Sequence, residues 1–257
     1  MAELIIEKVS KRFGGLLAVN NLDLKVPDGK ILSLIGPNGA GKTTVFNMIT
    51  GVYPPTEGAI TYKGKSINNL RSSRIVSRGI ARTFQNIRLF KSMTVLENVQ
   101  VGMHCRTNSG AIRALLKTSS EKREEKRITE KSQEILAFIG LIGHQNDYAS
   151  NLAYGEQRKL EIARALATQP ELLLLDEPAA GMNPKETAEL MELIIKLRDT
   201  GLTIFLVEHD MRLVMGISEI VTVLDYGQKI AEGTPREIQQ NEIVIEAYLG
   251  TGAKSQN

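Results

Sequence analysis

A glycine-rich loop at residues 36–43, Gly-Pro-Asn-Gly-Ala-Gly-Lys-Thr, is the stretch whose residue types and spacing most clearly allow chemistry. It matches the pattern G-x-x-x-x-G-K-[ST] and lies between a predicted strand and a predicted helix. In such a loop the backbone N–H groups point at phosphate oxygens, and the N-terminus of the following helix adds a positive dipole end. Lys42 can reach the β- and γ-phosphates, and the Thr43 hydroxyl can ligate Mg²⁺. The loop is therefore predicted to bind a triphosphate with Mg²⁺.

Two adjacent carboxylates follow a second apolar run. Residues 172–175 are all leucine, and Asp176, Glu177 and a proline come directly after them. Parallel strands carry their sites at the carboxyl edge, which would put these acids beside the phosphate loop. Asp176 is predicted to hold Mg²⁺ directly or through water, and Glu177 to position or deprotonate the attacking water. Without the phosphate loop, the same tripeptide would suit a solvated loop equally well.

Short apolar runs and turn signals predict the strands that must position these groups. The expected strands span residues 4–9, 16–26, 30–35, 171–175, 202–207, 220–224 and 229–232. A helix pattern begins near Lys42, and capping signatures at residues 183–186 and 234–237 predict two more helices, the first ending near Asp199. Alternating strands and helices imply right-handed crossovers and a mostly parallel sheet.

The middle of the chain, residues 89–155, reads as helical and more polar. Residues 121–131 are almost entirely charged, which predicts a solvated helix face, with contact to a partner as the alternative. The tail from Gly250 is expected to fray.

Composition excludes several classes of protein. The 257 residues suit one large domain or two small ones, and 42% hydrophobic and 24% charged residues exclude a disordered or low-complexity chain. The net charge of +3 is too small to argue for nucleic-acid binding. The single cysteine, Cys105, can form neither an internal disulfide nor a zinc site, which favours a reducing compartment. With no apolar run of membrane-spanning length and no signal-peptide core, we expect a soluble protein whose membrane role requires a partner.

Further motifs make the chain resemble an ATP-binding cassette subunit, the nucleotide-binding component of ABC transporters. Phe13 lies where an aromatic residue of that family stacks on adenine, and Gln85 lies in its glutamine loop. Residues 151–158, Asn-Leu-Ala-Tyr-Gly-Glu-Gln-Arg, correspond to the family signature, and His209 corresponds to its switch histidine. The resemblance covers essentially the whole chain, residues 3–250.

The resemblance implies an α/β fold. Its core would be a P-loop NTPase (RecA-like) domain with a mostly parallel sheet, joined by an N-terminal antiparallel β-subdomain and an inserted α-helical subdomain. We therefore expect residues 1–257 to form a single ABC ATPase domain, in which residues 87–160 approximate the inserted helical subdomain.

The resemblance also implies ATP and Mg²⁺ as cofactors of an ATPase. The implied nucleotide-binding residues are Phe13, Gly36, Pro37, Asn38, Gly39, Ala40, Gly41, Lys42, Thr43 and Thr44, with Ala153, Gly155 and Glu156 from the signature. The implied Mg²⁺ ligands are Thr43, Gln85 and Asp176, and the implied catalytic residues are Glu177, His209, Gln85 and Lys42. A glutamine suits this task because its amide offers an acceptor for Mg²⁺ and a donor for water. His209 would bond the γ-phosphate and keep Glu177 oriented.

In that family the signature of one subunit closes over ATP held by another. The resemblance therefore implies a head-to-tail pair, either a homodimer or a heterodimer with a second ABC ATPase subunit. It further implies integral membrane permease subunits, an indirect link to an extracytoplasmic substrate-binding protein, and no nucleic acid. The implied location is peripheral, on the cytoplasmic face of the inner membrane.

Two departures from the usual pattern affect single contacts. Ala153 replaces the signature serine and lacks the hydroxyl that would touch the γ-phosphate, although Gly155 and the helix end remain. Asn183 replaces the usual aspartate after the carboxylates, where we expect it to act mainly as a helix cap, with an inter-subunit contact as an additional role.

Residues 151–158, 176–187 and 208–218 look like the branched-chain amino acid importer branch, and most resemble the longer of its two ATPase subunits, with a helical insertion near residues 102–131. The alternatives are an ATPase of a lipid or lipopolysaccharide exporter, a soluble ABC-type ATPase of translation or repair, and a non-hydrolysing regulatory module. The helical insertion argues against the exporter. A single cassette argues against the soluble class, and the joint presence of Lys42, Asp176, Glu177 and His209 argues against a regulatory module.

The residues around Gln85 allow two interpretations. Arg82 and Arg88 are expected to be surface charges. Four apolar residues gather nearby and would pack in the core or line a groove for a short helix of the membrane subunit; they are Phe84, Ile87, Leu89 and Phe90. His104 and His144 lie in the helical region and are given no chemistry.

Overall fold

The computed structural model describes residues 3–104 and 119–253. An antiparallel sheet holds the N-terminal strands, in the order β2-β1-β4-β5. Its strands are β1 (Leu4–Phe13), β2 (Leu16–Val26), β4 (Glu57–Tyr62) and β5 (Lys65–Ser66). The hairpin that joins β1 to β2 closes with the pair Phe13 and Leu16, so Phe13 lies at the tip of the sheet.

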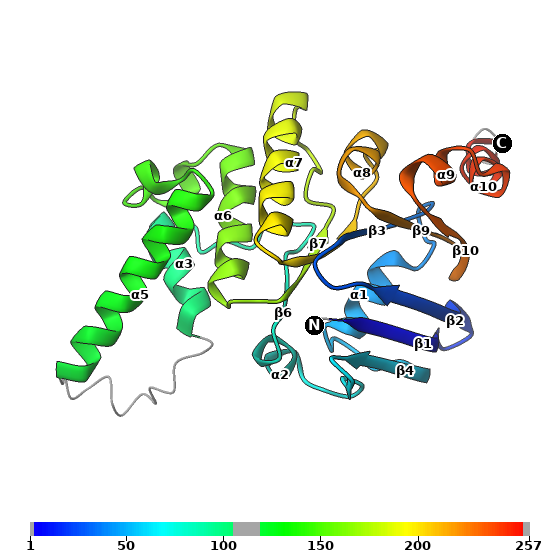
Figure 1. Ribbon diagram of the computed structural model, residues 1–257, viewed down its shortest axis with the longest axis horizontal. Coiled ribbons are helices and arrows are strands. Elements are labelled where there is room, and N and C mark those ends of the chain that lie inside the picture. Colours follow the sequence, from blue (N-terminus) through cyan, green and yellow to red (C-terminus); the bar gives the residue numbers. More distant parts are fainter. Residues whose placement is uncertain (1–2, 105–118, 254–257) are drawn as a thin grey trace.

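A larger sheet forms the centre of the molecule, in the order β10-β9-β3-β8-β7-β6 (Figure 1). Its strands are β3 (Ile31–Ile35), β6 (Ile80–Arg82), β7 (Leu172–Asp176), β8 (Thr203–Val207), β9 (Ile220–Asp225) and β10 (Gln228–Gly233). Neighbouring strands are parallel except β10, which runs antiparallel to β9. Every residue of β3, β7 and β8 is buried, as a parallel sheet covered on both faces requires.

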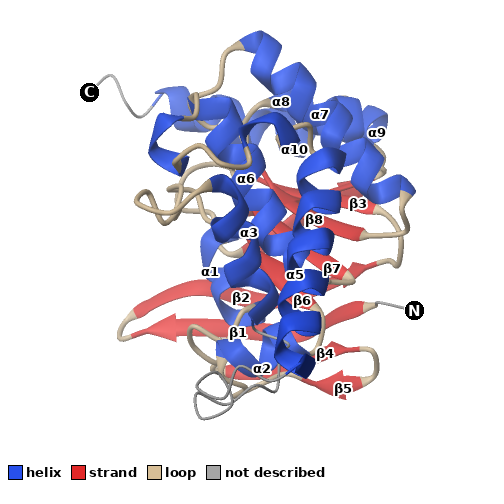
Figure 2. Cartoon of the chain, turned by 90° about the vertical axis from the view of Figure 1, so that its left-hand side faces the viewer, coloured by secondary structure: helices blue, strands red, loops and turns tan. Residues whose placement is uncertain are grey.

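Helices cover both faces of this sheet. They are α1 (Lys42–Ile49), α2 (Ser72–Ser77), α3 (Val95–His104), α5 (Ser119–Phe138), α6 (Tyr154–Ala167), α7 (Pro184–Asp199), α8 (Met211–Ile217), α9 (Pro235–Gln239) and α10 (Glu242–Ala253), with single 3₁₀ turns at Ile142–His144 and Ala149–Asn151. Figure 2 shows α3, α5 and α6 in front of the large sheet. None of the helices in the described ranges combines the length and hydropathy needed to cross a membrane.

The strand β7 shows how the two hydrophobic cores share one sheet. Its residues Leu173 and Leu175 face a core shared with α3, α6 and α7. Its residues Leu172 and Leu174 face a second core, built with α1 and the antiparallel sheet. Successive strand side chains point to opposite faces, so the leucines of β7 pack alternately into the two cores.

These observations confirm the α/β fold with its mostly parallel sheet and N-terminal antiparallel part. The predicted span of β2 is confirmed, whereas β1 runs four residues beyond the predicted 4–9. Its pairing with β2 has three register shifts, two of which lie beyond Val9. The charged stretch lies in α5 and is mostly exposed where described, as expected for a solvated face. Cys105 and part of the 102–131 insertion lie outside the described residues, as does the tail beyond Ala253.

Candidate nucleotide-binding and hydrolysis site

The loop between β3 and α1 is confined by neighbouring backbone. A Cβ atom on Gly36 would lie 2.0 Å from the Leu224 carbonyl oxygen, and one on Gly41 would lie 2.6 Å from the Ala18 carbonyl oxygen. Gly41 also has φ +103°, which side chains rarely tolerate. No side chain caps α1, so its first N–H groups are available to an anion. The glycines thus let the loop curl between β2 and β9.

Lys42 lies across this loop. Its buried ammonium donates to the carbonyl oxygens of Gly36 at 2.6 Å and Pro37 at 2.9 Å. Burial lowers the pKa of Lys42, while the negative charges of Glu177 and Asp176 act in the opposite direction. The two acids therefore lie close enough to Lys42 to oppose the lowering of its pKa.

A cavity of about 400 Å³ opens over the loop. The predicted residues that line it are Phe13, Asn38, Gly39, Ala40, Gly41, Lys42, Thr43, Thr44, Glu177 and His209. Phe13 is 43% exposed and contacts the Tyr53 ring edge-to-face at 5.1 Å between centroids, and the Lys11 ammonium lies 5.1 Å from the Phe13 centroid. Tyr226 at the β9–β10 turn also lines the cavity; its exposed position in a Tyr-Gly turn gave no sequence signal.

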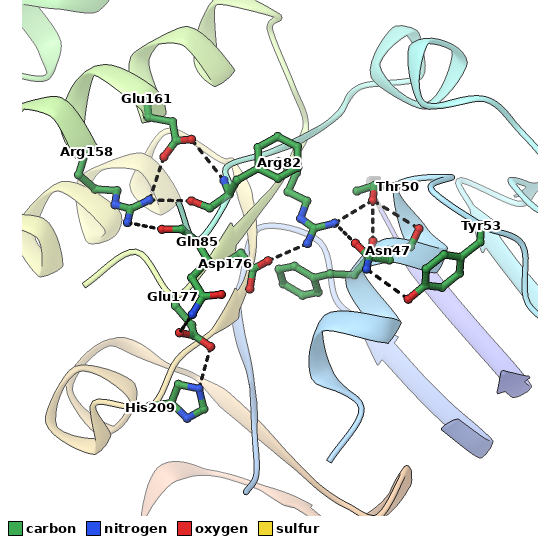
Figure 3. A network of polar contacts seen from close by, with 12 residues as sticks. Asn47, Thr50, Tyr53, Arg82, Gln85, Arg158, Glu161, Asp176, Glu177 and His209 are labelled. Carbon is green, nitrogen blue, oxygen red and sulfur yellow. Dashed lines mark hydrogen bonds and ion pairs between the residues drawn. The ribbon is translucent and has the colours of Figure 1, made fainter. Parts of the chain in front are cut away.

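The carboxylate of Glu177 is held at both oxygens. Glu177 directly follows β7 and has φ +47°, an unusual left-handed conformation for a residue with a side chain. Gln85 donates its amide to Glu177 Oε2 at 2.6 Å, and His209 Nε2 lies 2.7 Å from Oε1 (Figure 3). The structure thus brings together three predicted catalytic residues from three separate loops.

Glu208, which the sequence did not single out, fixes two of these loops. Its buried carboxylate accepts hydrogen bonds from Ala179 N at 2.8 Å, His209 N at 2.7 Å and Asp210 N at 3.1 Å. The loop after β7 and the loop after β8 are therefore tied together by one side chain. The sequence signal for Glu208 was its position directly after an apolar run and directly before a histidine.

Arg82 is not a surface charge, and this prediction was wrong. Its guanidinium donates to Asp176 Oδ2 at 2.7 Å, and the two side chains are only 6% and 5% exposed. Strand β6 is short and lies at the sheet edge, but α1 packs over Arg82 and removes it from solvent. Arg88 is exposed, as expected, and stacks on Phe84 at 4.4 Å from the ring centroid.

Arg158 on α6 anchors the glutamine loop. Its fully buried guanidinium donates to the carbonyl oxygens of Phe84 at 2.7 Å and Gln85 at 2.8 Å, and pairs with Glu161 at 2.9 Å. Burial raises the pKa of Glu161, and the charge of Arg158 opposes that rise. The sequence signal was two opposite charges three residues apart on an otherwise apolar helix face.

Among the described residues that line this cavity, none belongs to the signature. Ala153 precedes α6, and its N–H donates to Glu156 Oε2 at 3.0 Å. A Cβ atom on Gly155 would lie 2.9 Å from Glu186 Oε1 on α7, so a side chain at this position would displace the Glu186 carboxylate. Asn183 is confirmed as the cap of α7, because its side chain accepts from Lys185 N and Glu186 N, each at 3.0 Å.

Three of the predicted residues offer oxygen atoms for a hard cation. They are Thr43 through its hydroxyl, Asp176 through its carboxylate and Gln85 through its amide oxygen. The bond from Gln85 to Glu177 uses the amide nitrogen and leaves that oxygen for a metal. An all-oxygen donor set suits Mg²⁺ and does not suit zinc.

Comparison with known proteins agrees with this geometry. A model of the family described as ABC transporter matches residues 19–180, and one described as branched-chain amino acid ATP-binding cassette transporter matches residues 228–254. The high-affinity branched-chain amino acid transport ATP-binding protein LivG of Salmonella typhimurium is 53% identical over 248 residues, which are 96% of this chain and 97% of LivG.

More distant relatives share the same architecture. The lipopolysaccharide export system ATP-binding protein LptB of Escherichia coli is 34% identical over 97% of this chain and 98% of its own. The crystal structure of the ADP conformation of MJ1267, an ATP-binding cassette of an ABC transporter, has a TM-score of 0.85 and 33% identity, and covers 97% of this chain and 99% of that one. This chain therefore belongs to the ABC transporter family and is one of its ATP-hydrolysing, nucleotide-binding subunits.

Proposed function

We propose that the chain binds and hydrolyses Mg·ATP to power the import of branched-chain amino acids. The observation that carries the hydrolytic part is the carboxylate of Glu177, held by Gln85 and His209 at the mouth of the phosphate-loop cavity. The 53% identity with LivG against 34% with LptB supports an importer rather than a lipopolysaccharide exporter.

In the proposed reaction each residue has a distinct task. The loop N–H groups and Lys42 bind the phosphates, and Phe13 stacks on the adenine. Thr43, Asp176 and Gln85 hold Mg²⁺, which neutralises phosphate charge when bound. Glu177 orients the attacking water and accepts its proton, while His209 keeps the carboxylate in place and reaches the γ-phosphate.

The reaction requires a second cassette. Residues 153–156 lie outside the cavity of their own chain. Among the backbone N–H groups of the described residues, the Glu156 carboxylate accepts only from that of Ala153, and the Ala153 side chain caps none of the following N–H groups of α6, which can therefore bind an anion. We propose that they cover ATP held by a partner cassette, with Asn183 adding an inter-subunit contact. ATP then joins the two subunits, and its hydrolysis removes the bridging charge. The partner is either a second copy or a related chain.

A groove beside the glutamine loop suits a membrane partner. A cavity of about 490 Å³ lies there, and among its lining residues are Arg88, Leu89, Phe90 and Arg164. Phe90 is 47% exposed, so it does not pack in the core, where aromatic side chains are mostly buried. We propose that a short helix of a permease subunit occupies this groove, which is lined partly by the proposed helical subdomain at residues 87–160 and partly by residues on either side of it. This contact would place the cassette on the cytoplasmic face of the inner membrane. An extracytoplasmic substrate-binding protein would act through that permease.

Changes in this groove should separate ATP hydrolysis from transport. We expect Arg88→Glu or Leu89→Trp to reduce coupled transport by about tenfold, the effect of losing an interface contact worth roughly 1.4 kcal/mol, while basal ATPase activity stays within about twofold. Transport in reconstituted vesicles and ATP hydrolysis in detergent would be measured together. Arg236→Glu, an exposed charge reversal on α9, is the matched control. Unchanged assembly and transport in both groove variants would reject the groove.

Purification from membranes tests the proposed function most directly. We expect the chain to co-purify with integral membrane subunits, and the reconstituted complex to take up leucine, isoleucine or valine in an ATP-dependent manner. Uptake of none of these amino acids by an ATP-hydrolysing complex would contradict the substrate class but not the ATPase activity.

A further inference from the structure

The guanidinium of Arg82 bridges Asp176 and the helix that follows the phosphate loop. On one side it donates to Asp176 Oδ2 at 2.7 Å, and on the other Nη1 donates to Asn47 Oδ1 at 2.7 Å and Thr50 Oγ1 at 3.1 Å (Figure 3). Asn47 and Thr50 lie at the end of α1, so Arg82 joins β6, β7 and α1 at one point.

Packing leaves the guanidinium little freedom to rotate. It lies 5.5 Å from the Phe46 ring centroid and 5.3 Å from that of Phe84, between two aromatic side chains. Asn47 is itself held, because its amide donates to the Tyr53 hydroxyl at 3.2 Å. A planar group fixed by hydrogen bonds at both arms and by two rings defines the direction of its bond to Asp176.

That bond occupies one carboxylate oxygen and leaves the other. Only Oδ2 of Asp176 takes part in a side-chain hydrogen bond among the described residues. The second oxygen, Oδ1, is therefore available to ligate a metal ion. The partner of a ligating carboxylate sets its rotamer and charge, and changing such a partner typically lowers metal affinity about 10–100-fold.

We infer that Arg82 is a positioning residue that orients the carboxylate of Asp176 for Mg²⁺. The inference rests on the Mg²⁺ site of the proposed function. Arg82 is the last residue of β6, three residues before Gln85, so the same strand end also leads to a second proposed Mg²⁺ ligand. The guanidinium of Arg82 therefore aligns Asp176 with the start of the glutamine loop. It also neutralises a buried negative charge.

The test compares ATP affinity with and without Mg²⁺ in variants of full-length Glu177→Gln protein, in which hydrolysis is suppressed. The measured quantity is the ratio of the ATP dissociation constant in EDTA to that in Mg²⁺, obtained by calorimetry. We expect Arg82→Met to lower this ratio by about tenfold or more, and Arg82→Lys by about threefold or more, because an ammonium lacks the second arm of the fork. Affinity in EDTA should change by less than about threefold, since the loop contacts with phosphate remain.

Thr50→Val is the matched control, because it removes the hydrogen bonds of the Thr50 hydroxyl to the same guanidinium and to the Phe46 carbonyl oxygen, and leaves the bond between Arg82 and Asp176 in place. Its ratio should stay within about twofold of the parent, so general loosening around Arg82 is separated from misplacement of the carboxylate. A ratio within about twofold of the parent in either Arg82 variant would overturn the inference. If Arg82→Met fails to fold, Arg82→Lys decides the question alone. A parent protein that binds ATP equally well in EDTA and Mg²⁺ would instead contradict the Mg²⁺ site itself.

Discussion

Replacing Glu177 with glutamine should lower ATP turnover by at least about 10²-fold, the scale of losing a well-placed general base, while ATP binding stays near normal. A carboxamide has almost the same size as the carboxylate but cannot accept the proton of the attacking water. The cavity over the loop should keep its shape, so the nucleotide contacts of the loop are unaffected. Phosphate release would be followed at saturating Mg·ATP, and the ATP dissociation constant would be measured by calorimetry.

Glu192→Gln is a suitable control for this prediction, because Glu192 is exposed on α7 and does not line the cavity. Its turnover should equal that of the native protein. A Glu177→Gln protein that hydrolyses ATP at a near-normal rate would refute the assignment of the base. In that case the contacts with Gln85 and His209 would be structural only.

Local sequence patterns were sufficient for the parts of the site that lie on one continuous stretch. The loop at residues 36–43 could be recognised because its glycines, Lys42 and Thr43 follow one strand directly. Asp176 and Glu177 could be recognised because a run of leucines must be buried on both sides and must then end. In both cases the residue pattern and the strand end coincide in the sequence itself.

The buried charged residues could not be placed in the same way. Arg82 is buried by α1 and paired with Asp176, which is 94 residues away in the sequence. Arg158 is buried because the glutamine loop, more than 70 residues away, folds back over α6. Charged side chains are usually exposed, so a single sequence favours a surface position unless the partner is known. The prediction for Arg82 failed, and none was made for Arg158, because both environments come from distant segments.

The contacts around the glutamine loop join the groove to the carboxylate of Glu177. Gln85 bonds Glu177, and Leu89 lines the groove four residues later. The carbonyl oxygens of Phe84 and Gln85 are held by Arg158, which belongs to the helix that starts at the signature. A shift of this loop must therefore change the bonds to Glu177 and to α6 together. This physical continuity supports coupling between a permease helix and the hydrolytic site.

Replacing Lys42 with alanine should weaken nucleotide binding itself, in contrast to the change at Glu177. Lys42 has three N–H donors, two of which bond the carbonyl oxygens of Gly36 and Pro37 across the loop in this structure. We expect its ammonium to turn to the phosphates when ATP binds. Hydrogen bonds to charged groups contribute about 1.5–3 kcal/mol, so the ATP dissociation constant should rise about 10–100-fold.

Calorimetry with Mg·ATP measures this loss of affinity, and Lys91→Ala, at an exposed lysine outside the cavity, is the control. Because burial lowers the pKa of Lys42, keeping its ammonium charged inside the protein costs folding free energy at neutral pH. The variant loses that cost together with two hydrogen bonds, so the nucleotide-free protein should unfold at nearly the native temperature. A variant that stays folded and binds ATP with native affinity would show that the loop amides alone hold the phosphates.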